Sequence, residues 1–305
     1  MLGRVVLEHW VRSRSGRYVI STAIVLALVS TLGLGGGFVL TQFGLRWIPP
    51  SLGAACSIPS STLLFWCAAP FFVALGSANL AAAVLFGCIG LFFPGAVALL
   101  NFESNRLMGP NIAGAVSSIT PVFAVLLAVL LLGETLSSAR VLALTAIVCG
   151  VSMTYWGRGK ILSGRSVWLL ALPLAASAIR GLVQPIIKLG LAWWPNPIGA
   201  VVIGYTVSSA VLVISARLRS MSGATFDRRG ALWFSAVGIC NGLAVLAMYA
   251  ALGNGPVTVV SPLIASYPLV TLLLSRVFLK DEPVGTLLIG GVAVTVGGVI
   301  LLILT

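Results

Sequence analysis

Long apolar runs separated by short polar segments follow one another along almost the whole chain. A helical run of about 20 residues, at about 1.5 Å per residue, crosses a hydrocarbon core of roughly 30 Å. Most connecting segments hold only a few residues, so consecutive helices must be antiparallel neighbours with no soluble domain between them. The pattern predicts an all-α polytopic membrane protein with ten transmembrane helices, over residues 19–46, 51–76, 79–105, 110–133, 137–157, 166–189, 197–216, 230–253, 256–279 and 283–304.

Two of these spans share an unusual pattern. The stretches from Gly109 to Glu134 and from Gly255 to Glu282 each open with Gly-Pro, contain an internal proline and close with an acidic residue. Proline has no N–H, so it leaves a carbonyl of the preceding turn without its helical donor. In lipid such a carbonyl is tolerated only where it faces protein or a watery cavity. We therefore predict two broken helices beside a cavity, with Pro121, Pro262 and Pro268 as hinges.

The two halves of the chain repeat each other. Residues 44–54 match residues 190–200 at a constant shift of 146, and Gly150-Val151 match Gly298-Val299 at a shift of 148. Five helices per repeat is an odd number, so the second repeat enters the membrane from the opposite face. Inverted repeats of this kind are typical of transporters, because exchanging the conformations of two related halves exchanges inward-facing for outward-facing access. We expect a basic tail over 1–18, a first repeat over 19–157, a linker over 158–165 and a second repeat over 166–305.

Composition supports a membrane protein. Hydrophobic residues make up 59% of the chain, charged residues 8%, and the mean hydropathy is +1.12. A chain of this composition has more apolar surface than one water-soluble core needs. The net charge is +12, but the basic residues lie mostly in short loops, where they contact anionic lipid rather than nucleic acid. The apolar run after Met1–Arg17 is too long for a signal peptide. We expect a multi-pass protein of the inner (cytoplasmic) membrane.

The distribution of positive charge bears on orientation. With a cytoplasmic N-terminus, six basic residues would lie on the cytoplasmic side and eleven on the other. Positive charge concentrates on cytoplasmic loops, so this count favours an external N-terminus. The six are Arg4, Arg12, Arg14, Arg17, Arg140 and Lys188, and the eleven are Arg46, Arg106, Arg158, Lys160, Arg165, Arg217, Arg219, Arg228, Arg229, Arg276 and Lys280.

Three segments carry a family resemblance: Gly44–Pro50, Pro121–Glu134 and Tyr267–Thr271. With the duplicated five-helix pattern, they are similar to the EamA-like family of the drug/metabolite transporter superfamily, over about residues 20–304. The resemblance implies a ten-helix bundle with both termini cytoplasmic, a central substrate cavity, and export or exchange of small metabolites or drugs. This orientation is opposite to the one that the charge count favours. The chain departs from the family pattern at Lys280-Asp281-Glu282 and at Glu103.

Ionisable residues at membrane depth are the strongest candidates for a site, because burying one costs several kcal/mol unless it is paired or hydrated. Arg180 lies well inside the sixth span, Lys188 near its end, and Glu103 near the end of the third. We hypothesise that Arg180 or Lys188 attracts an anionic or zwitterionic substrate, with Glu103 as the partner of a coupling proton or cation. The structural alternatives are an ion pair between Glu103 and Arg106, an ion pair or carbonyl contact for Arg180, and a snorkelling Lys188.

Neutral polar residues extend the candidate site. Gln184 lies four residues after Arg180 and therefore on the same helical face. Serines beside the proline breaks could line the cavity, or could simply bond to the backbone at the kinks. Glu134 is interpreted as structural, serving the following helix or pairing near Arg140. The predicted substrate-binding residues are Gln42, Asn101, Glu103, Ser117, Ser118, Arg180, Gln184, Asn241, Tyr249, Ser261, Ser266 and Tyr267.

Motifs of catalysis are missing from the sequence, which holds no GxSxG, HExxH or Walker A pattern. The five cysteines fall within apolar runs without metal-ligand spacing, so we expect free thiols, no metal and no cofactor. The sequence favours a secondary transporter, monomeric or homodimeric, that exports or exchanges small polar metabolites such as amino acids by alternating access, with protons as a candidate coupling ion. The alternatives are an exporter of lipophilic cations, against which Arg180 counts, and an intramembrane enzyme or scaffold.

Overall fold

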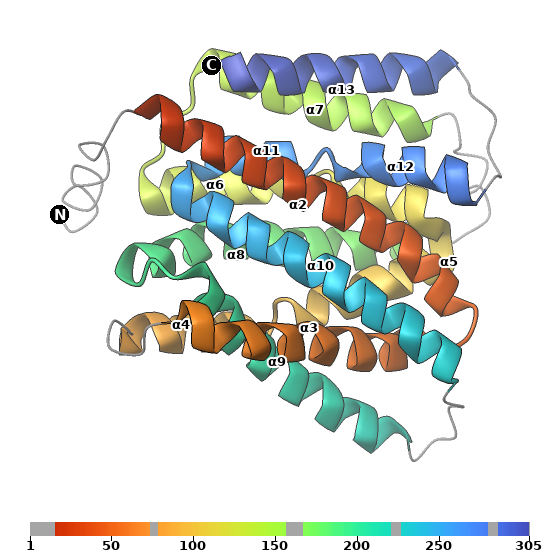
Figure 1. The fold of residues 1–305 in the computed structure, drawn as a ribbon. Helices are drawn as coiled ribbons and strands as arrows, with labels where there is room; N and C mark the ends of the chain where they lie inside the picture. The colour runs from red at the N-terminus through yellow and green to blue at the C-terminus, as the bar shows by residue number, and fades with distance from the viewer. Residues whose placement is uncertain (1–15, 74–78, 157–166, 221–226, 280–285, 305) are drawn as a thin grey trace.

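The computed structural model describes residues 16–73, 79–156, 167–220, 227–279 and 286–304, and almost all of them are helical (Figure 1). The first residues of α2 and the last of α13 lie at the same end of the bundle, which is called the terminal face below. The predictions made for residues 1–15, for the linker 158–165 and for Lys280-Asp281-Glu282 lie outside the described residues. The helices are α2 (Gly16–Leu45), α3 (Pro50–Phe72), α4 (Leu80–Gly90), α5 (Gly95–Ser117), α6 (Thr120–Leu132), α7 (Ser138–Trp156), η3 (Val167–Leu170), α8 (Ala171–Trp193), α9 (Pro197–Ser220), α10 (Arg228–Asn254), α11 (Val257–Ile264), α12 (Tyr267–Phe278) and α13 (Thr286–Leu304).

The helices have the length and composition of membrane spans. Seven helical stretches of the described chain are long and apolar enough to cross a bilayer, and one of them, Leu80–Gly114, runs through α4 into α5. Three shorter apolar helices accompany them, at Thr120–Leu132, Ser138–Met153 and Gly290–Leu304. The protein is therefore a nearly all-helical, multi-pass membrane protein.

Both broken helices occur where the sequence predicts them. The fourth predicted span is interrupted between α5 and α6, just before Pro121, and the ninth between α11 and α12, just before Pro268. Pro262 lies inside α11 instead. Gly109 has φ of +79°, a conformation that side chains with a Cβ rarely adopt, and this residue marks the turn between the third and fourth predicted spans.

The third predicted span is broken as well, which the sequence analysis did not expect. α4 ends at Gly90, a turn follows, and α5 begins at Gly95. The physical reason is Pro94, which lacks the N–H that would bond to the carbonyl of Gly90. The hydroxyl of Ser208 on α9 donates to that carbonyl at 2.5 Å instead. A residue more than a hundred positions away therefore satisfies the broken turn.

Hydroxyl groups satisfy backbone carbonyls at the other two breaks. Thr120 Oγ1 donates to the Ser117 carbonyl at 2.7 Å. At the break between α11 and α12, the Leu263 carbonyl accepts from Ser266 Oγ at 2.7 Å and from Thr31 Oγ1 on α2 at 3.1 Å. For Thr120 and Ser266, bonding to the backbone at the kinks is thus what the structure shows.

The two repeats pack against each other along the whole bundle. α10 lies against α2 and α3, α9 against α3, and α8 against α5 and α6. The broken helices also meet, α6 against α11 and α5 against α12. α7 and α13 pair at one edge of the bundle (Figure 1). In this pair Gly150 of α7 lies against Gly291 and Thr295, and Gly298 of α13 lies against Ala143 and Ile147.

Gly238 marks the closest approach of α3 and α10. A Cβ at this position would collide with the backbone of Ser57, and the carbonyl of Gly238 accepts a hydrogen bond from Ser61 Oγ at 2.7 Å. Overpacking of this kind costs about 1–3 kcal/mol, so Gly238→Ala should lower the melting temperature of the purified protein in detergent. Gly297→Ala is the matched control, because no described atom lies within 4 Å of the added methyl group. Equal melting temperatures for the two variants would contradict this close packing.

Candidate functional site

A cavity lies between the two repeats, among α2, α3, α5, α8, α9 and α10. The empty space of this hollow is about 510 Å³ when the part that is open to solvent is counted, so the enclosed part is smaller. Its walls are mostly apolar, with a few polar side chains, as in binding sites for small molecules. The broken segments α6, α11 and α12 contribute no described lining residue. The lining consists of Leu34, Phe38, Thr41, Ser57, Ile58, Phe93, Pro94, Val97, Ala98, Asn101, Phe102, Asn105, Arg180, Tyr205, Asn241 and Val245.

Arg180 is the cation of this cavity. It lies near the middle of α8, its residue is 7% exposed, and its Cζ is 5.7 Å from the ring centroid of Tyr267. The carboxylates of the described residues are engaged elsewhere: Glu103 pairs with Arg106, Glu134 with Lys188, and Asp227 accepts the N–H of Arg229. Within the described chain, therefore, no carboxylate neutralises Arg180. A buried charge of this kind is expensive unless a ligand or water pairs with it.

Hydrogen-bond acceptors accompany the guanidinium. Asn101 Oδ1, Asn241 Oδ1 and Ser57 Oγ are buried, and none has a hydrogen-bond partner among the described residues. Most buried polar atoms in proteins are paired, so unpaired oxygens on three lining residues indicate a place where a ligand supplies donors. The cavity thus combines one cation, several acceptors and apolar walls.

The predicted site residues fall into three groups. Asn101, Arg180 and Asn241 line the cavity. Gln42 and Tyr267 contact lining residues: Gln42 Nε2 donates to the Asn105 backbone carbonyl at 3.1 Å, and the Tyr267 ring stacks on Phe38 with 5.3 Å between centroids. The others do not belong to the lining, and they are Glu103, Ser117, Ser118, Gln184, Tyr249, Ser261 and Ser266.

Glu103 lies outside the cavity. Its side chain is 30% exposed and forms a salt bridge with Arg106, three residues further along α5. This is the structural alternative that the sequence analysis named. An exposed pair of this kind contributes little to stability, and the geometry gives Glu103 no contact with the cavity lining.

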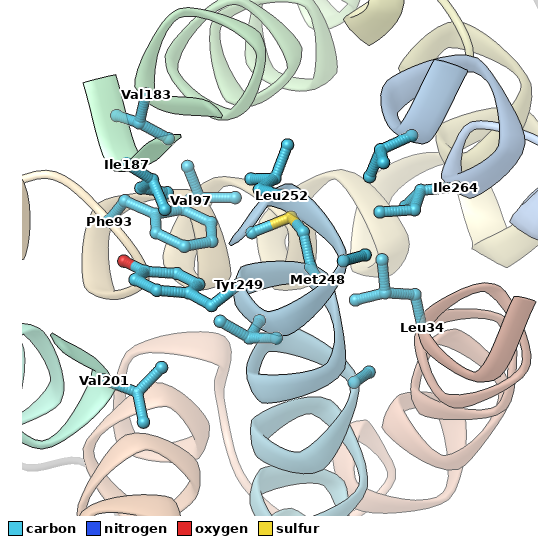
Figure 2. Close-up of a cluster of buried hydrophobic side chains, with 14 of the residues drawn as sticks. Leu34, Phe93, Val97, Val183, Ile187, Val201, Met248, Tyr249, Leu252 and Ile264 are labelled. Carbon is cyan, nitrogen blue, oxygen red and sulfur yellow. The ribbon is translucent and has the colours of Figure 1, made fainter. Parts of the chain in front are cut away.

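Tyr249 and Gln184 lie deeper in the bundle. Tyr249 belongs to a cluster of buried hydrophobic side chains with Phe93, Ile187 and Leu252 (Figure 2). Gln184 is 1% exposed, and its Oε1 has no hydrogen-bond partner within the described part of the chain. Two of the serines near the breaks bond to backbone: Ser117 Oγ donates to the Ala113 carbonyl at 2.8 Å and Ser266 Oγ to the Leu263 carbonyl at 2.7 Å. The buried Oγ of Ser261 has no hydrogen-bond partner among the described residues.

Sequence reasoning missed four polar lining residues, which are Thr41, Ser57, Asn105 and Tyr205. Asn105 lies four residues after Asn101, and this spacing puts both on one face of a helix, so the signal was present. Asn105 also holds α2 and α5 together, because its Nδ2 donates to the Phe38 carbonyl at 3.0 Å. Ser57 had no such local signal, since it stands in a run of small residues.

Glu134 makes the most extensive polar contact between the repeats in the described chain. Its Oε1 accepts from Lys188 Nζ at 3.0 Å and from the Val257 N–H at 2.9 Å, and its Oε2 accepts from the Thr258 N–H at 2.9 Å. Lys188 Nζ also donates to the Gly255 carbonyl at 2.8 Å. The side chains of Glu134 and Lys188 are 8% and 21% exposed. The carboxylate thus satisfies the free N–H groups at the start of α11.

This contact corrects two expectations. Glu134 serves the start of α11, far along the chain, rather than the helix that follows it, and Lys188 pairs instead of only snorkelling. The sequence held one signal for this pair. Glu134 and Lys188 lie at the ends of the fourth and sixth spans, and these two ends fall on the same face when consecutive helices alternate in direction. Burial alone raises the pKa of the Glu134 carboxyl, but Lys188 and the two amide donors outweigh burial and hold that pKa below its usual value.

The architecture and the cavity define a class: a helical membrane protein with two repeats and a polar cavity between them. The model of the EamA-like transporter family matches residues 21–156 and again residues 167–304. The chain belongs to the EamA-like transporter family, within the drug/metabolite transporter superfamily. Comparison with curated proteins gives no match. One solved structure, described only as a crystal structure of a protein, has the same fold, with a TM-score of 0.72 and 20% identity over 92% of this chain and 97% of that one.

Proposed function

We propose that this protein is a secondary transporter that exports or exchanges small polar metabolites by alternating access, through ten membrane crossings in the inner membrane. The observation that carries the proposal is Arg180, a buried guanidinium in a central cavity where no described carboxylate neutralises it. Membership of a transporter family supports movement of a solute rather than catalysis. The two inverted repeats on either side of the cavity supply the halves that such a mechanism needs.

The chemistry of the cavity favours a zwitterion such as an amino acid. A substrate carboxylate would form charge-assisted, bidentate hydrogen bonds with the Arg180 guanidinium. A substrate ammonium group would donate to the unpaired oxygens of Asn101 and Ser57. The aromatic rings of Phe38 and Phe93 in the wall would accept an apolar side chain. A lipophilic cation fits less well, because the described lining offers it a positive charge and no carboxylate.

Tyr267 is expected to position Arg180. An arginine over an aromatic ring gains about 0.5–2 kcal/mol, and the Tyr267 ring is the aromatic face beneath Arg180 in the structure. Tyr267→Leu should therefore raise the KM for substrate about five-fold or more, with little loss in maximal rate, whereas Tyr267→Phe keeps the ring and a KM near wild type. Initial rates of uptake into proteoliposomes would measure both constants. Equal KM values for Leu and Phe variants would refute this role.

Flux measurements test the proposed function directly. Purified protein in liposomes would be offered radiolabelled amino acids and nucleosides, with and without a pH gradient. We expect saturable flux of at least one zwitterionic amino acid, and stimulation by the gradient if protons are coupled. No flux across the panel would overturn the proposal and favour a membrane scaffold. A reporter fused to the C-terminus would show whether the terminal face is cytoplasmic, as in the family expectation, or external, as the charge count favours.

A further inference from the structure

The two ends of the cavity differ. Thr41, Ser57 and Asn105 line it and lie near the end of α2, the start of α3 and the Gly109 turn, all toward the face opposite the terminal face. A cluster of buried hydrophobic side chains adjoins the cavity (Figure 2), and its members Ile187, Val201 and Leu252 lie at the ends of their helices that point to the terminal face. Phe93 belongs both to the cavity wall and to this cluster. Apolar packing therefore separates the cavity from the terminal face.

The helices that build this cluster continue to the terminal face. Ile187 belongs to α8, Tyr249 and Leu252 to α10, and Val201 to α9 (Figure 2). Beyond them lie Lys188 of α8 and Gly255, the residue after α10. Gly255 packs against Ala23, near the start of α2, which places this region at the terminal face. Glu134, Lys188 and the start of α11 thus cover the hydrophobic cluster on the side away from the cavity.

The contact of Glu134 joins the two repeats at the terminal face. Glu134 follows α6 of the first repeat, whereas Lys188 and the amides of Val257 and Thr258 belong to the second. Any motion that opens the terminal face between α6, α8 and α11 must break these hydrogen bonds. Separating a buried carboxylate from its ammonium and amide partners is costly, so the contact favours the closed arrangement.

α8 links this contact to the substrate cavity. Arg180, Gln184 and Lys188 are four residues apart and lie on one face of the helix. The buried, unpaired Oε1 of Gln184 stands between the cavity residue and the ion pair. α8 also contacts the second broken helix at two points, at its break through Arg180 against Tyr267 of α12 and just before its start through Lys188 against Gly255. A ligand on Arg180 therefore acts on the helix that carries Lys188.

From these contacts, and resting on the transport function proposed above, we propose that Glu134, Lys188 and the start of α11 form the gate that closes the cavity toward the terminal face. Gln184 lies on the path of the substrate between Arg180 and this gate. When the gate opens, Glu134 loses Lys188 and the two amides together, and Gln184 becomes reachable from the terminal face. In the arrangement described here the gate is closed.

Access of a charged thiol reagent to residue 184 tests the gate. Cys would replace Gln184 in a chain whose five native cysteines are changed to Ser, and the reagent 2-(trimethylammonium)ethyl methanethiosulfonate would be added to one face of sealed vesicles at a time. In the Glu134→Gln and Lys188→Met variants we expect modification from the terminal face to become at least about tenfold faster, because the closed arrangement loses a buried pair. Modification from the opposite face should change little.

The matched control is Glu103→Gln, which removes an exposed carboxylate from a salt bridge outside the cavity and should leave both rates unchanged. Faster modification from both faces at once would indicate a loosened fold. No change at either face would show that the contact of Glu134 only stabilises the fold. Either result would overturn the gate. A flux assay on the same variants separates the two proposals. Faster modification without any flux in the parent protein rejects transport alone, whereas normal flux with unchanged modification rejects the gate alone.

A charge exchange sharpens the test further. The double variant Glu134→Lys with Lys188→Glu exchanges the two charges, so an ion pair can form again between positions 134 and 188. The gate should stay open, because the amides of Val257 and Thr258 require an acceptor at position 134 and would meet an ammonium group instead. Restored protection of residue 184 in the exchanged variant would show that the start of α11 has no part in the gate.

Discussion

Replacing Arg180 with Gln is expected to abolish transport while leaving the amount of protein in the membrane unchanged. Gln lacks the charge and the paired donors that hold a carboxylate, and the loss of about 3 kcal/mol of charge-assisted hydrogen bonding corresponds to roughly a 100-fold lower flux at low substrate concentration. Arg180→Lys should be intermediate, because Lys keeps the charge but not the planar, bidentate geometry. Counterflow of the substrate found in the flux panel would measure all three proteins.

The control for this prediction is Arg106→Gln. Arg106 is an arginine of the same bundle, exposed and paired with Glu103 rather than facing the cavity, so its loss should leave flux near wild type. Transport that persists unchanged in Arg180→Gln would show that the buried guanidinium is not part of the substrate site. The amount of each variant in the membrane would be compared by quantitative blotting.

Removing Glu134 is expected to have the largest effect on stability. Glu134→Ala leaves Lys188 partly buried without its carboxylate and leaves two amides at the start of α11 without their acceptor. Breaking one side of a buried pair costs about 3–5 kcal/mol. The double variant Glu134→Ala with Lys188→Met should recover part of that loss, because no unpaired charge remains. Thermal unfolding in detergent would compare the single and double variants, and an equal loss in both would contradict the pairing.

Acidification should weaken the same contact. The pKa of Glu134 is lower in the folded protein than its usual value, so the ionised carboxylate stabilises the fold at neutral pH. This contribution is complete above the unfolded pKa of about 4.3, and it is lost as the pH falls from there through the lower, folded pKa. Below pH 4.3 the melting temperature of the wild type should therefore approach that of Glu134→Gln. A constant difference between the two proteins down to pH 3 would contradict the ionised contact.

Local chemistry let the sequence predict part of this architecture. Pro121 and Pro268 remove hydrogen bonds within their own helices, so their breaks follow from the chain alone. The sequence analysis missed the break at Pro94, although the same rule applies. The Gly90 carbonyl that this break leaves free is satisfied by Ser208, which only the packing of α9 brings close. At Pro94 the freed carbonyl is satisfied by a neighbouring helix, whereas at Pro121 the Ser117 carbonyl is satisfied by Thr120 of the same segment.

In the site too, local signals were visible in the sequence and tertiary contacts were not. Arg180 was foreseen, because a charge in the middle of an apolar run is costly wherever the helix packs. The roles of Glu103 and Glu134 were not separable in sequence, since both acids stand near a helix end with an arginine close by. Their difference arises from tertiary contacts. One carboxylate meets only its own helix, and the other meets two elements of the opposite repeat.

The pair formed by α7 and α13 bears on the relation between the two halves of the chain. The two helices end corresponding repeats, and their contact is reciprocal, since Gly150 of one and Gly298 of the other each face the partner helix. Reciprocal contact of equivalent residues is the property of a two-fold interface between identical subunits. The family model matches each half of the chain once. At this edge the two matching halves therefore pack as two copies of one unit would.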